Sequence, residues 1–377
     1  MKLQVATSLA DVPPEDWNRL AGNDPFLQYA FLNGLHESGC ATPETGWSPQ
    51  YLLLQDGDGL AGAMPLYLKD HSYGEYVFDW AWADAYHRHG IPYYPKLLSA
   101  IPFSPVTGSR LLARDPACRD QLVLGALELA RRTETTSLHV LFPSAADLEC
   151  LGAHGFLIRK GRQFHWQNHG YPDFETFLSG LNHDKRKKIR QERRKVREAG
   201  ITFRWLEGNA IRESDWKFFS RCYNRTYREH QSSPYLNLDF FLHIGFAMPD
   251  YLVLVIAERD GAPIAASLLI RNDTCLYGRH WGSLEYHPAL HFETCYYQGI
   301  EYAIRRGLQV FEGGAQGEHK MARGLMPVTT QSAHWLAHPG FADAIANFLE
   351  RESAMMESYD LELTARTPFR NARNGID

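Results

Sequence analysis

The sequence predicts an α/β (α+β) protein of two domains, each with a mixed central sheet flanked by helices. Its 377 residues include 44% hydrophobic side chains, enough for a sizeable core, and two domains are more common than one at this length. The two halves also share one order of elements, in which two strands joined at an Asp-Gly turn precede a helix and a further strand. We therefore expect an internal structural duplication, with domains at residues 1–165 and 166–377.

The first half begins with helical patterns, and a hairpin of two strands follows them. We expect helices at 14–20 and 25–37, a strand at 50–54, a turn at 56–59, a return strand at 60–69, a helix at 119–132, a strand at 136–142, and a short helix and a strand within 146–159. Residues 73–108 are rich in aromatic residues and proline, which predicts irregular structure rather than one long element.

The second half repeats this plan. We expect helices at 213–229 and 238–247, three strands within 251–282, a helix at 291–307 that stops at Gly307, a strand at 308–314 and a last strand at 332–336.

A basic segment at residues 182–200 lies between the halves and contains nine Lys or Arg against three acidic residues. Ile189 and Val196, seven residues apart, predict a helix with a narrow apolar face. Two interpretations stay open: a solvated charged helix, or a surface that binds the phosphate groups of a ligand. The segment has no aromatic residue for base stacking, so DNA is not an expected partner. The candidate phosphate-binding residues are Lys185, Arg186, Lys188, Arg190 and Arg193.

The segment FEGGAQGEHKMARG (311–324) holds many ionisable side chains directly after a predicted strand. It is either a solvated polar turn or one wall of an active site that segments 277–282 and 291–298 complete. Carboxylates and histidines beside cations can take a proton from an ammonium group and hold an anionic acyl donor, as acyl transfer to an amine requires.

The candidate catalytic residues, as base or orienting groups, are Glu312, Glu318, His319 and Glu293. The candidate substrate-binding residues are Arg279, His280, Trp281, His291, Tyr296, Gln316, Lys320 and Arg323. The candidate proton donors for the leaving group are Tyr277, Tyr296 and Tyr297.

A second polar and aromatic patch, HSYGEYVFD, offers His71, Tyr73, Glu75 and Asp79. These four residues line the acceptor side of a cleft in one interpretation and form a turn that covers the core in the other.

Several other classes of protein lack support in the sequence. The six cysteines include no CxxC pair, so neither a zinc ribbon nor a disulfide framework is expected. His291 and Cys295 share a helix face, but HExxH spacing is absent, and no metal site is predicted. GxSxG and P-loop motifs are also absent. No run of 18 apolar residues occurs and the N-terminal residues do not form a secretory signal, so we expect no transmembrane segment and a cytoplasmic protein.

Longer motifs resemble a known family. The segments PFLQYAFLNGLHESGC, PLYLKDHSYGEYVFDWAWADAY, LHFETCYYQGIEYAI and EGGAQGEHKMARGLMPVTTQSAHWL look like those of bacterial FemAB-like proteins, which are labelled as peptidoglycan biosynthesis proteins. The resemblance covers nearly the whole chain. It implies two tandem GNAT-like acyltransferase domains and transfer of an acyl or aminoacyl group to a primary amine, with aminoacyl-tRNA as donor and the basic segment near the second domain to bind it.

The sequence departs from acetyl-CoA-dependent relatives of this fold. The glycine-rich turn that would cradle a pyrophosphate is replaced by SLEYHPALHFE after the strand at 277–282. Acetyl-CoA is therefore the less favoured donor, and no cofactor is assigned. Two alternatives remain: a CoA-dependent N-acetyltransferase, and a non-catalytic module that binds peptidoglycan or RNA. The sequence does not indicate an oligomeric state.

Overall fold

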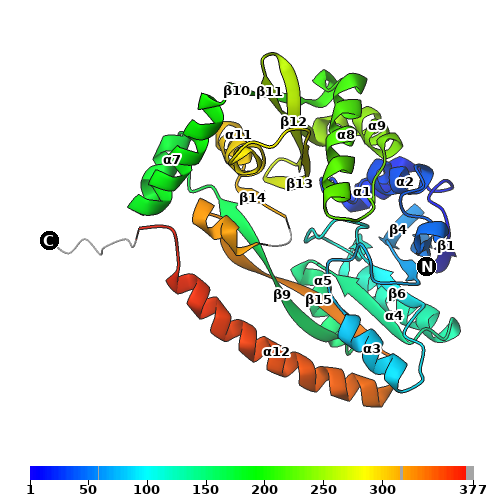
Figure 1. Ribbon diagram of the computed structural model, residues 1–377. Helices are drawn as coiled ribbons and strands as arrows, with labels where there is room; N and C mark the ends of the chain where they lie inside the picture. Colours follow the sequence, from blue (N-terminus) through cyan, green and yellow to red (C-terminus); the bar gives the residue numbers. More distant parts are fainter. Residues whose placement is uncertain (58, 315–316, 371–377) are drawn as a thin grey trace. The chain divides into compact units, whose positions relative to one another are not determined.

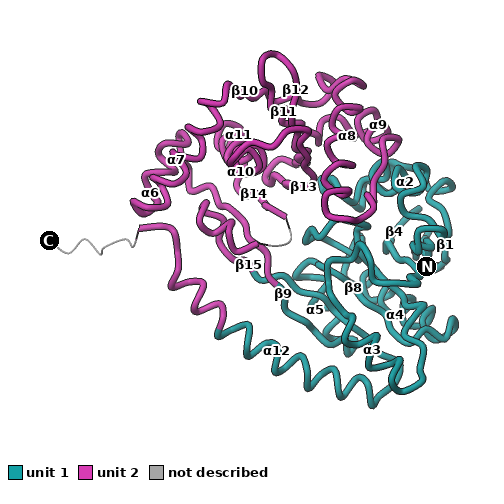
Figure 2. Tube along the Cα trace, in the orientation of Figure 1, with its two compact units in different colours: residues 1–161, 329–358 teal, residues 162–328, 359–377 magenta. Residues whose placement is uncertain are grey.

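The computed structural model describes residues 1–57, 59–314 and 317–370 of the chain. They form two compact units, shown in Figures 1 and 2. Unit 1 comprises Met1–Gly161 and Thr329–Ser358, and unit 2 comprises Arg162–Val328 and Tyr359–Asp377. Three elements, β9 (Leu157–Gln167), β15 (Met326–Leu336) and α12 (Pro339–Ala365), carry the chain from one unit into the other.

The second domain was expected to span residues 166–377, but the chain returns to unit 1 at residues 329–358. Strand β15 pairs with β8 (Ser137–Leu141), so its second part lies in the sheet of unit 1. The first turns of α12 then pack Phe341 and Ile345 against Trp82 and Tyr86. The first contact joins segments about 200 residues apart and the second joins segments more than 250 residues apart, which local sequence patterns do not reveal.

Unit 1 contains two groups of paired strands, in the orders β1-β3-β4-β7 and β15-β8-β6-β5-β2. The elements wholly within it are β1 (Lys2–Ala6), α1 (Pro14–Ala21), α2 (Tyr29–Glu37), η1 (Pro43–Thr45), β2 (Trp47–Pro49), β3 (Tyr51–Asp56), β4 (Gly59–Met64), β5 (Tyr67–Lys69), α3 (Trp80–Arg88), β6 (Lys96–Ser99), β7 (Leu112–Ala113), α4 (Pro116–Arg132), β8 and α5 (Ala145–Ala153). Leu122 and Ala126 of α4 pack with Leu52 and Leu54 in the core.

Two expectations for unit 1 differ from the structure. The single return strand at 60–69 is two strands, β4 and β5, because Pro65 lies between them and lacks the N–H that a continuous ladder needs. The segment 73–108, expected to be irregular, includes helix α3, whose apolar face is buried through Trp82 and Tyr86.

Unit 2 has the strand order β10-β11-β12-β13-β14-β9, in which β13 and β14 are the parallel pair. Its elements are α6 (Phe174–Gly180), α7 (His183–Glu198), β10 (Ile201–Glu207), η2 (Gly208–Ala210), α8 (Glu213–Glu229), α9 (Leu238–Ala247), η3 (Pro249–Tyr251), β11 (Leu252–Arg259), β12 (Ala262–Arg271), β13 (Cys275–Ser283), α10 (Leu290–Phe292), the π-helical turn η4 (Glu293–Tyr297), α11 (Gln298–Arg306), β14 (Val310–Glu312) and η5 (Glu318–Arg323). Among the described residues, no helix is both long and apolar enough to cross a bilayer.

Strands β13 and β14 pair over a short distance only, and β13 then continues with β12 as its paired neighbour. Their parallel pairing runs from Cys275 opposite Val310 to Tyr277 opposite Glu312. Beyond that point β13 carries a bulge, since Leu268 and Leu269 of β12 face His280 and Gly278, which leaves Arg279 as the extra residue. The side chains after the end of β14 therefore lie beside an irregular stretch of its neighbour.

Helix α8 approaches β13 closely at Gly282. A Cβ atom at this position would lie 2.0 Å from the carbonyl oxygen of Cys222 in α8. The hydroxyl of Thr226 donates a hydrogen bond of 3.1 Å to the carbonyl of Trp281 at the same crossing. Because the clash involves backbone on both sides, small side-chain movements cannot relieve it.

We expect Gly282→Ala to lower the free energy of unfolding by about 3 kcal/mol, near the upper end of the usual cost of overpacking. The midpoint of chemical unfolding measures the effect. Gly152→Ala in α5 is the matched control, because a Cβ there meets nothing within 4 Å. Equal midpoints for the two variants would contradict the close approach.

Candidate functional site

The end of β14 places a carboxylate beside a histidine that sequence reasoning missed. Glu312, 7% exposed, is the cross-strand partner of His165 on β9, and its Oε1 lies 4.0 Å from His165 Nε2. Burial, and secondly the charge of Lys320, lower the pKa of His165 to about 4, so its ring is neutral near pH 7. The pairing of β9 with β14 joins distant segments, and no local pattern indicated it.

Lys320 is a buried cation next to this pair. Its side chain is 3% exposed, and Nζ donates a hydrogen bond of 2.8 Å to the carbonyl oxygen of Gly314. Burial, and secondly Arg279, lower the pKa of Lys320 to about 8, so the ammonium form still predominates at neutral pH. Within the described residues, this ammonium group donates one hydrogen bond of the three it can make, which suits a group that holds an anion.

His319 and Tyr296 form a second pair, from η5 and the π-helical turn. The hydroxyl of Tyr296 lies 3.3 Å from His319 Nε2. Burial, then Arg323 and Lys320, lower the pKa of His319, while burial raises that of Tyr296. A neutral imidazole therefore faces a protonated phenol. Single π-helical turns often occur at functional sites, because the extra residue redirects the side chains that follow.

Aromatic rings extend the pair toward β13. The ring of His291 lies 5.5 Å from that of Tyr296 and 4.7 Å from that of Trp281. Burial, and secondly the neighbouring His319, lower the pKa of His291 to about 4. Trp281 and His291 thus belong to the same cluster as His319 and Tyr296.

Arg323 positions this segment and does not face outward as an anion holder. Its Nη1 donates a hydrogen bond of 2.8 Å to the carbonyl oxygen of His319, and its Nη2 lies 3.0 Å from both carboxylate oxygens of Glu192 in α7. The guanidinium lies 3.4 Å from the ring centre of Phe292, and Glu192 also accepts a hydrogen bond from Tyr297. Arg323 therefore fixes the backbone that carries His319.

The structure places some of the candidate residues away from this cluster. Glu318 is exposed, and among the described residues it has no hydrogen bond or ion pair. The carboxylate of Glu293 accepts hydrogen bonds from Arg193 of α7 and from Gln298, the first residue of α11. The ring of His280 packs against Tyr223 of α8. Gln316 lies outside the described residues.

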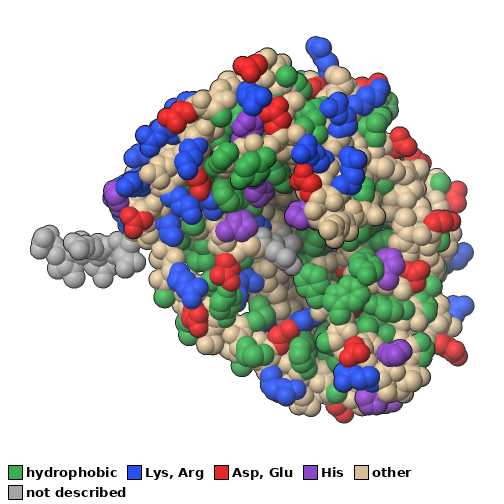
Figure 3. Space-filling view, viewed as in Figure 1, with side chains coloured by type: hydrophobic (Ala, Val, Ile, Leu, Met, Phe, Trp, Pro, Cys, Tyr) green, Lys and Arg blue, Asp and Glu red, His purple; other side chains and the backbone are tan. Residues whose placement is uncertain are grey.

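Helix α7 forms as expected and has one buried and one cationic face. Ile189 and Val196 are buried, and Asn182 caps the helix by accepting a hydrogen bond from the backbone N–H of Lys185. Figure 3 shows Lys and Arg side chains gathered over this helix. The five expected phosphate-binding residues divide between the exposed Lys188 and Arg190 and the half-buried Lys185, Arg186 and Arg193.

A cavity of about 630 Å³ lies beside α7 within unit 2. Arginines from α7 form one side of it, namely Arg190, Arg193, Arg194 and Arg197. Arg193 is held by Glu293 and Glu301, and Arg190 pairs with Glu175. Within the described chain, Arg194 and Arg197 have no ion pair, so their charges are available to a ligand.

In unit 1, the patch at residues 71–79 contains a buried ionic network. Lys96 is fully buried, and its Nζ lies 2.8 Å from Glu75 Oε2 and 2.5 Å from Asp79 Oδ2. Burial alone would lower the pKa of Lys96, but the two carboxylates outweigh it and raise that pKa. Burial also raises the pKa of Glu75 to about 7. Glu75 and Asp79 are thus counter-ions inside the unit.

The other two residues of the patch lie nearer the surface. His71 is half-buried, with Nδ1 3.3 Å from the Nζ of Lys69, a second fully buried lysine. Tyr73 is 58% exposed and packs edge-on against the ring of Trp80. Sequence reasoning missed Lys69 and Lys96. Lys96 lies among apolar and aromatic residues, whereas Lys69 follows an apolar run and precedes Asp70 and His71.

Comparison with solved structures finds proteins of the same fold. FemX has a TM-score of 0.56 and 11% identity, covering 92% of this chain and 100% of its own. The C-terminal domain of a protein described as a lysylphosphatidylglycerol synthetase from Agrobacterium fabrum has a TM-score of 0.54 and 10% identity, covering 89% of this chain and 95% of its own. L-PGS from Bacillus licheniformis has a TM-score of 0.51 and 10% identity, with coverage of 89% and 97%. At these identities the likeness shows the fold alone.

A comparison with curated proteins finds no match to this sequence. The family model of FemAB-like proteins, described as peptidoglycan biosynthesis/recognition, matches residues 8–371. This span includes nearly all of both units, and the expected fold class, α/β with two tandem GNAT-like domains, is confirmed. The chain therefore belongs to the FemAB-like family.

Proposed function

We propose that unit 2 transfers an acyl or aminoacyl group to a primary amine. The observation that carries this proposal is the neutral His319 within 3.3 Å of the protonated Tyr296 hydroxyl, beside the buried cation Lys320. A base, an acid and a cation in one place are the groups that acyl transfer to an amine requires. The family description supports a peptidoglycan peptide as the source of the amine.

Each group has a definite task in this reaction. The amine, after losing one proton to solvent, forms a bond to the acyl carbon, and the bond from that carbon to the donor oxygen breaks. His319 takes a proton from the attacking nitrogen, and Tyr296 gives one to the departing oxygen. Because the two side chains are adjacent, the imidazolium then returns its proton to the phenolate. Lys320 stabilises the negative charge that develops on the acyl oxygen.

The basic face of α7 supports aminoacyl-tRNA as the donor. Its exposed cations offer phosphate contacts without base readout, which suits a donor recognised mainly through its backbone. The cavity lined by Arg194 and Arg197 has room for part of a nucleotide. Glu312 and His165 lie beside Lys320 and complete the polar wall of the proposed site.

A transfer assay tests the reaction and the donor together. The full chain is incubated with an amine-bearing peptidoglycan stem peptide and either labelled aminoacyl-tRNA or labelled acetyl-CoA. We expect label on the peptide from aminoacyl-tRNA. Label on the peptide from acetyl-CoA alone would support acyl transfer but would show that acetyl-CoA, not aminoacyl-tRNA, is the donor. No product from either donor, with tRNA still bound, would favour a binding module over an enzyme.

Removing the unpaired charges of α7 should weaken tRNA binding in a salt-dependent way. We expect the double variant Arg194→Gln/Arg197→Gln to lower the slope of log affinity against log salt concentration by about 2, since each phosphate contact contributes about 1. Fluorescence anisotropy at several salt concentrations measures this slope. Arg131→Gln/Arg132→Gln on α4 removes the same charge elsewhere and should leave it unchanged. An unchanged slope for the α7 variant would exclude this face as the tRNA contact.

A further inference from the structure

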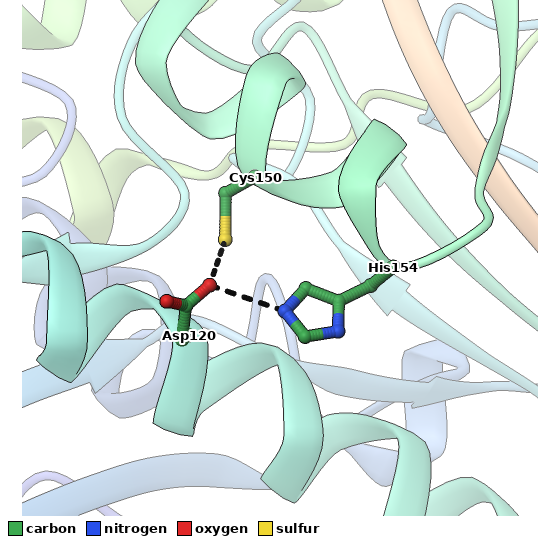
Figure 4. A group of neighbouring side chains, drawn as sticks. All are labelled: Asp120, Cys150 and His154. Atoms are coloured by element: carbon green, nitrogen blue, oxygen red, sulfur yellow. Dashed lines mark hydrogen bonds and ion pairs between the residues drawn. The ribbon is translucent and has the colours of Figure 1, made fainter.

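Helices α4 and α5 of unit 1 meet at three side chains of metal-binding type. Figure 4 shows Asp120 from α4 facing Cys150 from α5 and His154, the residue that follows α5. One atom, Asp120 Oδ1, accepts a hydrogen bond of 3.2 Å from Cys150 Sγ and lies 3.1 Å from His154 Nε2. The three potential ligand atoms all lie within 4.8 Å of one another.

The positions of the three residues follow from the two helices. Cys150 and His154 are four residues apart, so they share one face of α5, and His154 is the first residue after its last turn. Asp120 lies in the second turn of α4, which packs against α5 through Cys118, Leu122 and Leu151. The cluster is outside the proposed catalytic site, because every part of it belongs to unit 1.

The geometry points to a zinc site in which Asp120, Cys150 and His154 bind one Zn²⁺ and water completes a tetrahedron. Zinc bonds to sulfur, nitrogen and carboxylate oxygen are about 2.0–2.3 Å long, which places neighbouring ligand atoms of a tetrahedron roughly 3.3–3.7 Å apart. The observed separations of 3.1 and 3.2 Å need to widen only slightly.

The donor set also suits zinc in chemical type. Thiolate and imidazole ligands select zinc over calcium and magnesium, which prefer oxygen alone. On binding, the thiol proton of Cys150 leaves to solvent, and His154 binds through Nε2 in the tautomer that carries its proton on Nδ1. The charges of one thiolate and one carboxylate then balance the ion. The metal would then connect α4 to α5 in place of the two contacts that Asp120 Oδ1 makes with Cys150 and His154.

Cobalt substitution tests the site in the full-length protein. We expect metal-free protein to bind one Co²⁺ per chain with a sulfur-to-cobalt charge-transfer band and visible bands typical of tetrahedral geometry, and Zn²⁺ to displace it. Zn²⁺ should also raise the melting temperature, because an ion that binds the folded state stabilises it.

The variant Asp120→Asn separates metal binding from folding. Its amide oxygen can still accept both hydrogen bonds, but it is a poor ligand for zinc. We expect its metal affinity to fall at least about tenfold, since even groups behind the ligands change affinity roughly 10–100-fold. Cys150→Ser should abolish the charge-transfer band. Glu149→Gln removes an exposed carboxylate from the same helix and should change neither result. Absence of the band in the wild type, or equal affinities of wild type and Asp120→Asn, would overturn the proposal.

Discussion

Replacement of Lys96 by Met should lower the free energy of unfolding of unit 1 by about 3–5 kcal/mol, because breaking a buried ion pair leaves uncompensated charge inside the protein. The fully buried ammonium of Lys96 contacts Glu75, Asp79 and the hydroxyl of Ser72. Without it, two carboxylates that are 4% and 3% exposed face each other with no cation between them. Chemical unfolding followed by tryptophan fluorescence measures the change.

Two further variants test this explanation. Lys2→Met removes a lysine from the surface of the same unit and should leave the unfolding midpoint nearly unchanged, since Lys2 is exposed. The triple variant Lys96→Met/Glu75→Gln/Asp79→Asn removes all three charges and should recover much of the lost stability. If the single and triple variants are equally unstable, packing and not charge explains the role of Lys96.

Replacement of His319 by Gln should reduce kcat/KM for acyl transfer roughly 10²–10⁴-fold, the usual contribution of a general base. Gln keeps a polar side chain of similar reach but cannot accept a proton from the amine. The variant should fold normally, since the ring of His319 is at the surface and Arg323 contacts only its backbone carbonyl. Initial rates in the transfer assay measure the loss.

The pH dependence gives a second readout of His319. Because burial, Arg323 and Lys320 lower its pKa, the imidazole of the wild type is neutral at pH 7 and gains a proton below pH 6.5. The rate should therefore fall as the pH decreases through this lowered pKa, and His319→Gln should lose that limb of the profile. Glu318→Gln, a change at the adjacent exposed residue, should leave rate and profile intact. Equal rates for wild type and His319→Gln would remove this histidine from the mechanism.

The secondary structure of unit 2 was more predictable than that of unit 1. The expected helices at 213–229 and 238–247 match α8 and α9, because regular apolar periodicity and, for α9, an Asn cap mark them. Helix α3 was missed, because its two buried aromatic residues occur within an aromatic-rich segment that shows no helical period. Its burial depends on α12, more than 250 residues later.

The candidate site was likewise predictable only where the signal is local in the sequence. The sequence predicted Glu312, His319 and Lys320 as candidates, because glycine and charge after a strand are a local signal. It did not identify His165, which reaches Glu312 through strand pairing. It also grouped Glu293 with His319, although the carboxylate of Glu293 is bound by Arg193 on α7. The local sequence indicated which residue types could act in a site, whereas contacts with distant segments determine where each side chain points.

Through Glu192, helix α7 has a structural role in unit 2 in addition to its positive charge. The carboxylate of Glu192 accepts a hydrogen bond from Arg323, and Arg323 donates another to the backbone carbonyl of His319. These two hydrogen bonds connect the helix to the residue that carries the imidazole. A polyanion that binds the exposed face of α7 and shifts the helix would also shift Glu192, Arg323 and the backbone at His319. Two side chains thus connect α7 to the proposed proton acceptor, His319.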